Sequence, residues 1–241
     1  MNVKLVALVA SALFAAACGP SIVPELKSDT DSFLAKLGQS KRSVKAAGSL
    51  DVQAWKVGQW ALYATTDDEG RPGYERLSVV RQDSCGIWLQ IERQTYFNRQ
   101  LQQICYKRMP KPPGDVRKAV DDALDMVQVM KTKVDDNPTQ VIDLRAMPGM
   151  KFMMRSVAQG IVTGVWLDPK APQETKTVRG GTFEGAVKMN VTATILFVTV
   201  QATTWSHPDV PVNALVKSVT DSGYTQELLG YGATGAEDKP L

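Results

Sequence analysis

The side chains best suited to acid–base or nucleophilic chemistry lie in one short segment, SHPD at residues 206–209. This segment holds the only histidine of the chain, His207, between Ser206 and Asp209. A catalytic triad needs a nucleophile, a base and an orienting carboxylate in a defined mutual geometry. Three residues so close together in one loop do not readily adopt it. The segment therefore predicts a turn and not a triad.

Metal and nucleotide chemistry find equally little support. A single histidine has no histidine partner for a metal site, and Cys85 and Cys105 lack the close spacing of zinc ligands. The glycine-rich string GYGATG at 230–235 follows a predicted strand but opens no amphipathic helix, which a nucleotide-binding loop requires. We expect a protein that is not an enzyme and that has no metal and no cofactor.

The N-terminal residues indicate where in the cell the protein is located. Lys4 precedes an apolar stretch of about ten residues, which is too short to span a bilayer core of about 30 Å. Small residues follow, as signal peptidases require. Ala15-Ala16-Ala17-Cys18 resembles the lipobox of bacterial lipoproteins, in which the cysteine is acylated and becomes the first mature residue. The alternative is an ordinary secretory signal with an incidental cysteine.

The lipobox resemblance implies a signal peptide at 1–17 and a membrane anchor of acyl chains on Cys18. Two or more chains hold a protein stably on a membrane. The next residue is Gly19. In enterobacterial lipoproteins, a residue other than aspartate at this position is typical of proteins sent to the outer membrane. We therefore expect a lipid-anchored protein of the bacterial cell envelope, at the outer membrane and facing the periplasm.

The remaining cysteines are even in number once Cys18 is acylated. An oxidising envelope compartment permits Cys85 and Cys105 to form a disulfide. Two unpaired thiols are the alternative, because sequence does not show whether the two Cβ atoms approach closely enough.

Charge gives no argument for a nucleic-acid partner. The full chain of 241 residues carries 28 basic and 25 acidic residues, and removal of 1–17 takes away one lysine. The mature charge of about +2 is close to balance. We expect residues 18–48 to form the lipidated N-terminus, a tether and a helix, and residues 49–241 to form a single domain.

Hydrophobic periodicity predicts a sheet with a helical insert. Period-two alternation between short turns predicts an antiparallel meander. Its strands are expected at 59–66, 74–82, 87–94 and 99–108, and further strands at 174–193, 194–206, 211–220 and 223–232. Three- and four-residue spacings predict helices. These are expected at 31–47, at 114–132 and, as a helix or an apolar loop, at 147–162. The tail after Gly232 lacks apolar periodicity and is expected to fray.

Segment order suggests a family. VGQWALY (57–63), TVRGGTFEG (177–185), WSHPDVPVNALVKS (205–218) and ELLGYG (227–232) resemble segments of a group of uncharacterised bacterial envelope lipoproteins. The layout over most of 55–232 is similar to the lipoprotein carriers LolA and LolB. This resemblance implies an α+β fold: a curved antiparallel sheet, or open half-barrel, with helices packed on its concave face around an apolar cavity for acyl chains. No individual functional residue follows from it.

A methionine-rich segment is the candidate ligand site within such a fold. Flexible, polarisable side chains can adapt to an acyl chain. The residues expected to border the site are Met147, Met150, Phe152, Met153, Met154 and Val157. The alternative is that they fill gaps in the core. The five tryptophans, spread along different strands, are expected to pack within the sheet.

Two functions remain. One is a carrier or chaperone that binds a lipid, a lipoprotein or an acyl chain in an apolar cavity. The other is a non-catalytic structural or assembly lipoprotein that uses its sheet as a docking surface for a protein whose identity the sequence does not indicate. An unfilled cavity favours the first function, and a packed interior favours the second.

Overall fold

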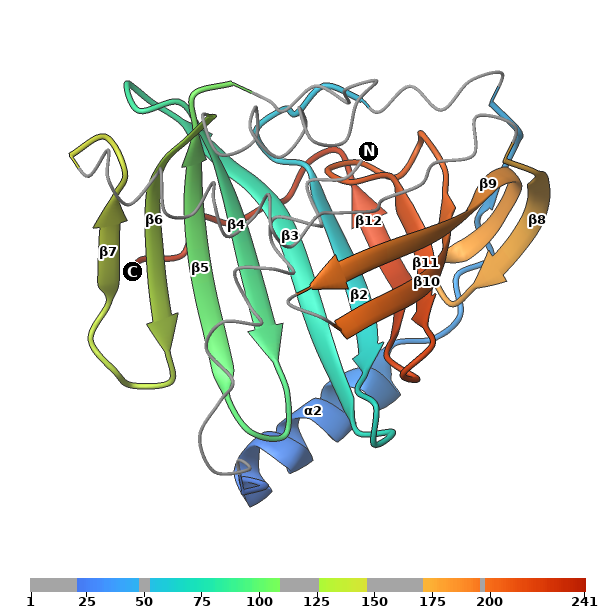
Figure 1. The fold of residues 1–241 in the computed structure, drawn as a ribbon, viewed down its shortest axis with the longest axis horizontal. Coiled ribbons are helices and arrows are strands. Elements are labelled where there is room, and N and C mark those ends of the chain that lie inside the picture. The colour runs from blue at the N-terminus through green and yellow to red at the C-terminus, as the bar shows by residue number, and fades with distance from the viewer. Residues whose placement is uncertain (1–20, 48–52, 109–125, 147–170, 196–197) are drawn as a thin grey trace.

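The structure, a computed structural model, describes residues 21–47, 53–108, 126–146, 171–195 and 198–241. In these residues, twelve strands form one sheet with the order β1-β9-β10-β11-β12-β2-β3-β4-β5-β6-β7, and β8 pairs with β9 (Figure 1). The elements are α2 (Pro24–Lys36), β1 (Ser43–Val44), β2 (Trp60–Thr66), β3 (Pro72–Gln82), β4 (Ile87–Gln94), β5 (Arg99–Tyr106), β6 (Val127–Val134), β7 (Gln140–Asp143), β8 (Gln173–Val178), β9 (Gly181–Ile195), β10 (Val198–Ser206), β11 (Leu215–Thr220) and β12 (Thr225–Gly232).

The sheet is almost wholly antiparallel. Consecutive strands from β2 to β7 pair with one another, and the one parallel pair among the described strands joins β1 to β9. The strand β12 pairs with β2, which joins the C-terminal strands to the N-terminal meander. Short turns suffice for such a meander, whereas parallel neighbours would need long crossovers.

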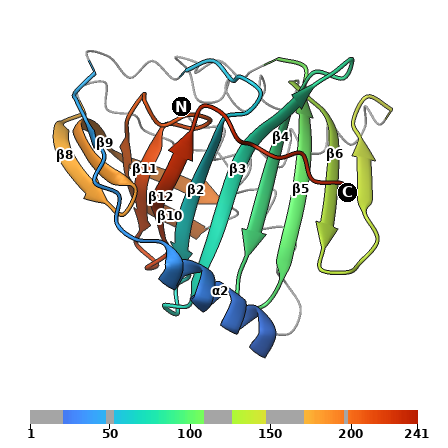
Figure 2. The same ribbon diagram turned by 180° about the vertical axis from the view of Figure 1, so that it is seen from behind.

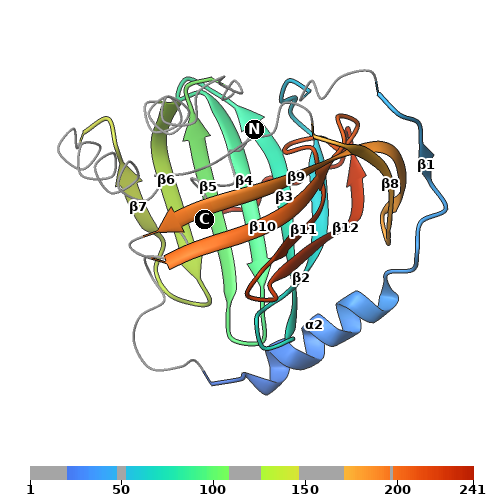
Figure 3. The ribbon, with the colours of Figure 1, turned by 45° about the vertical axis from the view of Figure 1, so that its right-hand side comes forward.

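The sheet has two distinct faces. The long β9–β10 hairpin crosses in front of β2 and β3, and we call the face of the sheet on this side the inner face (Figures 1 and 3). The opposite, outer face carries α2 and the C-terminal tail, residues 233–241 (Figure 2). Because side chains alternate along a strand, each of these strands sends every second residue to each face.

The main hydrophobic core lies on the inner face. Ala61 on β2 is opposite Leu77 on β3, which is opposite Ile91 on β4, and all three are buried. Phe183 of β9 is fully buried and belongs to the same cluster. The period-two pattern of the sequence therefore corresponds to one apolar layer under the hairpin.

The predicted α+β class, with helices packed on the concave face, is wrong. The described residues contain one α-helix, α2, and it lies on the outer face, where Phe33 contacts Tyr74 with ring centroids 4.4 Å apart. The inner face is covered instead by strands of the same sheet. A sheet that bends over itself can bury its apolar face without a helical layer.

The helix predicted at 31–47 is displaced. It begins at Pro24, and proline fits the first turn of a helix because its missing N–H would be unpaired there. Glu25 in the first turn and Lys36 in the last turn both suit the helix dipole. The helix ends before Gly38, and Ser43–Val44 then forms β1. Nowhere in the described ranges is a helix both long and apolar enough to cross a membrane.

The helix predicted at 114–132 is wrong at its C-terminal end. Residues 114–125 are outside the described residues, but β6 begins at Val127. Val127 packs in the inner core and Val129 packs on the outer face beside Trp88. β-Branched side chains suit a strand, and a strand that starts with apolar residues on both faces does not alternate cleanly between apolar and polar residues there.

The C-terminal tail is ordered rather than frayed. It crosses the outer face of the meander from β12 toward β5 (Figure 2). The Ala236 amide donates to the carbonyl of Gly58 at 2.9 Å, and the Trp60 indole donates to the carbonyl of Thr234 at 2.9 Å. These are hydrogen bonds from groups far away in the chain, which local periodicity does not reveal.

Candidate functional site

Three hairpin turns enclose a pocket of about 350 Å³ at one end of the inner face. They are the β2–β3, β4–β5 and β11–β12 turns. We call this the end pocket. Aromatic and proline side chains, Pro72, Tyr96, Phe97 and Tyr224, form much of its wall. The volume lies within the range of small-molecule sites.

A partly buried ion pair lies between the end pocket and the core. Glu75 on β3 and Arg93 on β4 are directly opposite in register on the inner face. The Arg93 Nε donates to Glu75 Oε2 at 3.1 Å, and Gln226 Nε2 donates to the other carboxylate oxygen at 2.8 Å. Both oxygens of this buried carboxylate are thus paired, as a buried charge requires.

The ion pair also sets the electrostatics at the base of the pocket. Burial alone lowers the pKa of the Arg93 guanidinium, but the Glu75 carboxylate outweighs burial, so that the pKa is raised. Burial raises the pKa of the Tyr224 phenol, and the Glu75 carboxylate raises it further. Tyr224 therefore stays a neutral phenol, and Arg93 stays a cation whose charge is balanced within the protein.

The rim of the pocket is fixed by the β2–β3 turn. The Asp67 Oδ1 accepts hydrogen bonds from the amides of Glu69 and Arg71, at 3.0 and 2.8 Å. Burial alone would raise the pKa of Asp67, but these bonds and the Arg71 side chain hold it below 3.8. The Arg71 guanidinium lies 4.6 Å from the centroid of Phe97, a cation–π distance.

Gly73 leaves no room for a side chain in the pocket wall. A Cβ at this position would lie 2.7 Å from the carbonyl oxygen of Gln94 and 2.8 Å from Thr65 Oγ1. A glycine here thus permits the close approach of β3 to β4 where the pocket begins.

The lining of the end pocket is suited to binding an uncharged surface. Its charged side chains, Asp67, Arg71 and Arg93, are all paired within the protein. What faces the space is mainly aromatic rings and the aliphatic parts of polar residues. Such a surface favours an apolar or amphipathic ligand, since it offers no unbalanced charge.

The residues predicted to line an acyl-chain site lie outside the described residues. These are Met147, Met150, Phe152, Met153, Met154 and Val157. Cys18, predicted to be lipidated, is also outside them. These predictions remain predictions.

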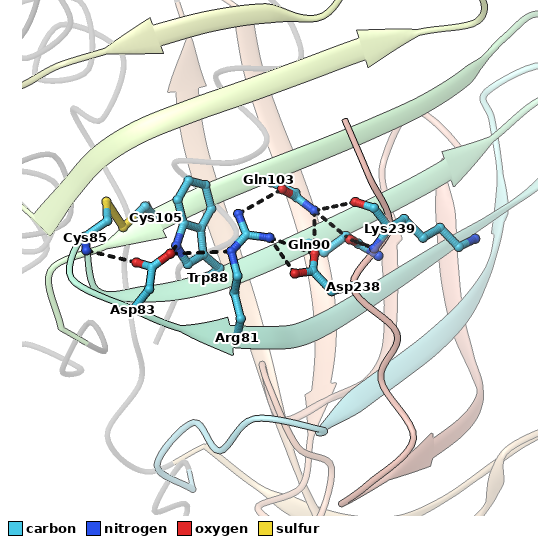
Figure 4. A network of polar contacts seen from close by, with 9 residues as sticks. All are labelled: Arg81, Asp83, Cys85, Trp88, Gln90, Gln103, Cys105, Asp238 and Lys239. Carbon is cyan, nitrogen blue, oxygen red and sulfur yellow. Dashed lines mark hydrogen bonds and ion pairs between the residues drawn. A yellow bond between two sulfur atoms is a disulfide. The ribbon is translucent and has the colours of Figure 1, made fainter.

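Cys85 and Cys105 form a disulfide, with Cα atoms 6.4 Å apart (Figure 4). Cys85 lies in the β3–β4 turn, where Asp83 accepts hydrogen bonds from the Cys85 amide and the Trp88 indole, both at 2.9 Å. Asp83 and the two cysteines also form the one group of three potential metal ligands within the described part of the chain. Metals bind thiolates, and the bonded sulfurs are not thiolates.

The segment around His207 is a buried turn. The Asp209 amide donates to His207 Nδ1 at 3.2 Å, and Nε2 lies 3.1 Å from the carbonyl oxygen of Lys45. Since Nδ1 accepts, Nε2 carries the proton and donates it to that carbonyl. The imidazole is fully buried and joins the β10–β11 connection to the segment after β1.

The four tryptophans within the described residues do not converge on one site. Trp55 and Trp205 are buried in the inner core, whereas Trp60 and Trp88 lie on the outer face. Trp166 is outside the described residues. The expected packing role fits the four described tryptophans.

Sequence reasoning missed the residues of the end pocket. Glu75 and Arg93 occupy positions that the alternation of their strands assigns to the apolar face. Two opposite charges at such positions, on consecutive strands, were a usable signal for a buried pair. The part played by Phe97 and Tyr224 had no signal, because each lies in or beside a turn and they meet only through tertiary structure.

Comparisons with known proteins leave the family open. No protein-family model matches the chain, and no curated protein sequence is significantly similar to it. A solved structure of a Bacteroides fragilis protein with a YmcC-like fold is similar at 11% identity and a TM-score of 0.33, covering 76% of this chain and 100% of that one. A likeness this low supports no inference about function. The comparisons also give no specific support to the resemblance to LolA and LolB.

Proposed function

We propose that the protein is a non-catalytic, lipid-anchored protein of the bacterial envelope that binds an amphipathic ligand with an acyl chain. The anchoring part of this proposal comes from Ala15-Ala16-Ala17-Cys18. The binding part comes from the end pocket. The apolar portion of the ligand lies against Phe97, Pro72 and Tyr224, and its polar end lies near the hydroxyl groups of the β11–β12 turn.

The observation that carries the binding proposal is the pocket beyond the Glu75–Arg93 pair. The apolar core ends at this pair, and about 350 Å³ of space lies beyond it. Core side chains do not fill this space, and its walls are largely apolar. A solvent-facing apolar recess with internally paired charges is suited to a ligand that brings its own apolar surface.

Filling the pocket tests this function. Ser222 lies in the β11–β12 turn, is exposed, and lines the pocket. The Ser222→Trp side chain would occupy the space without disturbing the core. We expect it to weaken binding of a fluorescent fatty acid by at least about tenfold, which corresponds to about 1.4 kcal/mol.

Ser84→Trp is the matched control, because Ser84 is an exposed residue of the β3–β4 turn and does not line the pocket. It should bind like the wild type. Circular dichroism of both variants establishes that they are folded. Equal binding by Ser222→Trp and Ser84→Trp, or no saturable binding by the wild type, would reject the end pocket as the site.

The anchoring part has its own test. Cys18→Ser removes the thiol that would be acylated, so the protein should leave the membrane fraction or accumulate as an uncleaved precursor. Fractionation and mass spectrometry of the N-terminus measure both results. Normal processing with membrane retention would contradict lipidation at this residue.

A further inference from the structure

The outer face carries a straight row of residues beneath the C-terminal tail. Trp60, Ser78, Gln90 and Gln103 are directly opposite one another on β2, β3, β4 and β5. We call these four residues the outer row. The tail crosses the strands above this row (Figures 2 and 4).

The outer row contacts the backbone of the tail. Trp60 Nε1 donates to the carbonyl of Thr234 at 2.9 Å. Gln90 donates from Nε2 to the carbonyl of Glu237 at 3.0 Å and accepts at Oε1 from the Lys239 amide at 3.0 Å. Gln103 Nε2 donates to the Lys239 carbonyl at 2.8 Å. Backbone contacts of this kind recognise an extended chain whatever its side chains are.

The spacing of the row matches an extended peptide. Trp60 and Gln103 are three strands apart, or about 14 Å at the usual strand separation. The five steps from Thr234 to Lys239 span about 16 Å in extended conformation. The tail therefore covers the distance from β2 to β5 with little slack, and the backbone departs from extended geometry at Gly235, whose φ is +94°.

Three of the four residues of the outer row are polar although they are buried. Gln90 is 0% exposed, Gln103 is 2% exposed and Ser78 is 1% exposed. The Ser78 hydroxyl and the Arg76 Nε beside it are buried without a hydrogen-bond partner. Buried polar groups are normally paired, so a row of them fits a surface shaped to hold a polar ligand better than it fits a core.

Two side chains of the tail are recognised as well. The Asp238 carboxylate accepts a hydrogen bond from Arg81 Nη1 at 2.6 Å and another from Gln103 Nε2 at 2.9 Å (Figure 4). Arg81 is held in place because it stacks 4.1 Å from the ring of Trp88. The following Lys239 pairs with Glu92. The surface thus distinguishes an acidic residue followed by a lysine.

The tail itself is held without an apolar anchor. Thr234, Gly235, Glu237 and Asp238 are exposed, and none of residues 233–241 is buried. Its attachment rests on hydrogen bonds and ion pairs, which water and salt can replace. A segment held in this way can leave without taking part of the core with it.

We propose that the outer row is a docking site for an extended peptide with an acidic residue followed by a lysine, and that residues 234–239 occupy it as an exchangeable ligand. The same segment supplied on a separate peptide binds the row when the tail of the chain is absent. This site lies on the face opposite to the end pocket and does not depend on its function.

The test separates the tail from the domain after folding. A specific protease sequence inserted between Gly232 and Ala233 allows the full chain to fold with its tail in place before cleavage. After cleavage and gel filtration, a fluorescent peptide of residues 233–241 is titrated, and binding is followed by anisotropy. We expect saturable binding to the cleaved protein, at least tenfold weaker apparent binding to the uncut protein, and weaker binding at high salt.

Two variant peptides provide a matched pair. Asp238→Ala removes the carboxylate that Arg81 and Gln103 recognise, and we expect it to weaken binding by about tenfold. Glu237→Ala removes the same charge one residue earlier, where the row contacts the carbonyl oxygen, and should change affinity by less than about threefold.

Three results would overturn the proposal. The cleaved protein could remain folded and fail to bind the peptide at millimolar concentration. It could lose its circular dichroism signal when the tail leaves, which would make the tail an integral part of the fold. The two variant peptides could also lose affinity equally, which would reduce recognition to general charge attraction. Fatty-acid binding by the cleaved protein tests the end pocket separately.

Discussion

The two faces of strands β2–β5 bury neighbouring residues in different ways. On the inner face, Val79 and Leu89 are 0% and 3% exposed and pack with other apolar side chains. One residue away on the same strands, Ser78 and Gln90 are buried just as deeply on the outer face, beneath the tail. An apolar side chain gains free energy from leaving water whatever apolar group it meets, whereas a buried amide needs a partner at the right position. The inner face therefore supplies stability, and the outer face supplies specificity.

The largest expected effect is on the inner face. Phe183→Ala should lower the free energy of unfolding by about 3–5 kcal/mol, because it removes a fully buried ring and leaves a cavity. Urea denaturation measures the change. Phe97→Ala, at the half-exposed wall of the end pocket, is the control and should cost clearly less. Equal costs would show that the inner core is not the main source of stability.

Loss of the disulfide should have the next largest effect on the free energy of unfolding. Cys85→Ala combined with Cys105→Ala opens a link between residues 20 positions apart and should cost about 3 kcal/mol, since the unfolded chain gains freedom. Urea denaturation in the absence of reductant gives the difference. The wild type under reducing conditions should approach the variant, and an unchanged midpoint in both cases would contradict the prediction.

A matched pair on β4 compares the two faces directly. Gln90→Met keeps the volume but loses the hydrogen bonds to the tail, so it should change the free energy of unfolding by about 1 kcal/mol or less. Leu89→Gln, the adjacent residue on the inner face, should cost about 3 kcal/mol by burying an unpaired amide. Hydrogen exchange at the Lys239 amide should become at least about tenfold faster in Gln90→Met alone. Equal stability losses would mean that both faces are held in the same way.

The smallest expected effect is a pH dependence of stability that comes from Asp83, at the edge of the outer face. Burial alone would raise the pKa of Asp83, but the hydrogen bonds from Trp88 and Cys85 hold it below its usual 3.8. Because the pKa of Asp83 is lower in the folded protein than in the unfolded chain, its ionised carboxylate stabilises the folded protein above pH 3.8. This stabilisation is lost as the pH falls through the pKa that Asp83 has in the folded protein. Asp83→Asn should therefore be less stable than the wild type at pH 7.

The difference between Asp83→Asn and the wild type should shrink as the pH falls below 3.8. Urea midpoints measured from pH 7 to pH 3 would show it. Ser84→Asn, at the next exposed residue, serves as the control and should show no such trend. A constant difference across this range would mean that Asp83 does not contribute through its charge.

Strand positions in the meander were predictable because their signals are local. The predicted strands at 59–66, 74–82, 87–94 and 99–108 agree with β2–β5 to within two residues at each end. Alternation places one face of each strand in the core, and turn residues end it, so neither signal depends on the rest of the chain. The strand at Val127 was mistaken for helix because its first apolar residues pack on both faces of the sheet and so break the alternation.

The end pocket and the outer row were not predictable in the same way. Gln90 and Gln103 are ordinary polar residues in the sequence, and the tail has no periodicity. Their burial follows from the register that aligns four strands and from a tail that returns across them. The candidate segment at 147–162 was chosen by composition alone and lies outside the described residues.

The sequence by itself determined which segments of the meander are strands, where they turn and which cysteines could pair. Only the tertiary structure decided which element covers each face, because the covering segments come from distant parts of the chain. A strand shows in its own residues that one side is apolar. It does not show whether a helix, a hairpin or the C-terminal tail will lie against the other side. The tail on the outer face is held by contacts between residues more than a hundred positions apart, and such contacts leave no trace in local hydrophobic periodicity.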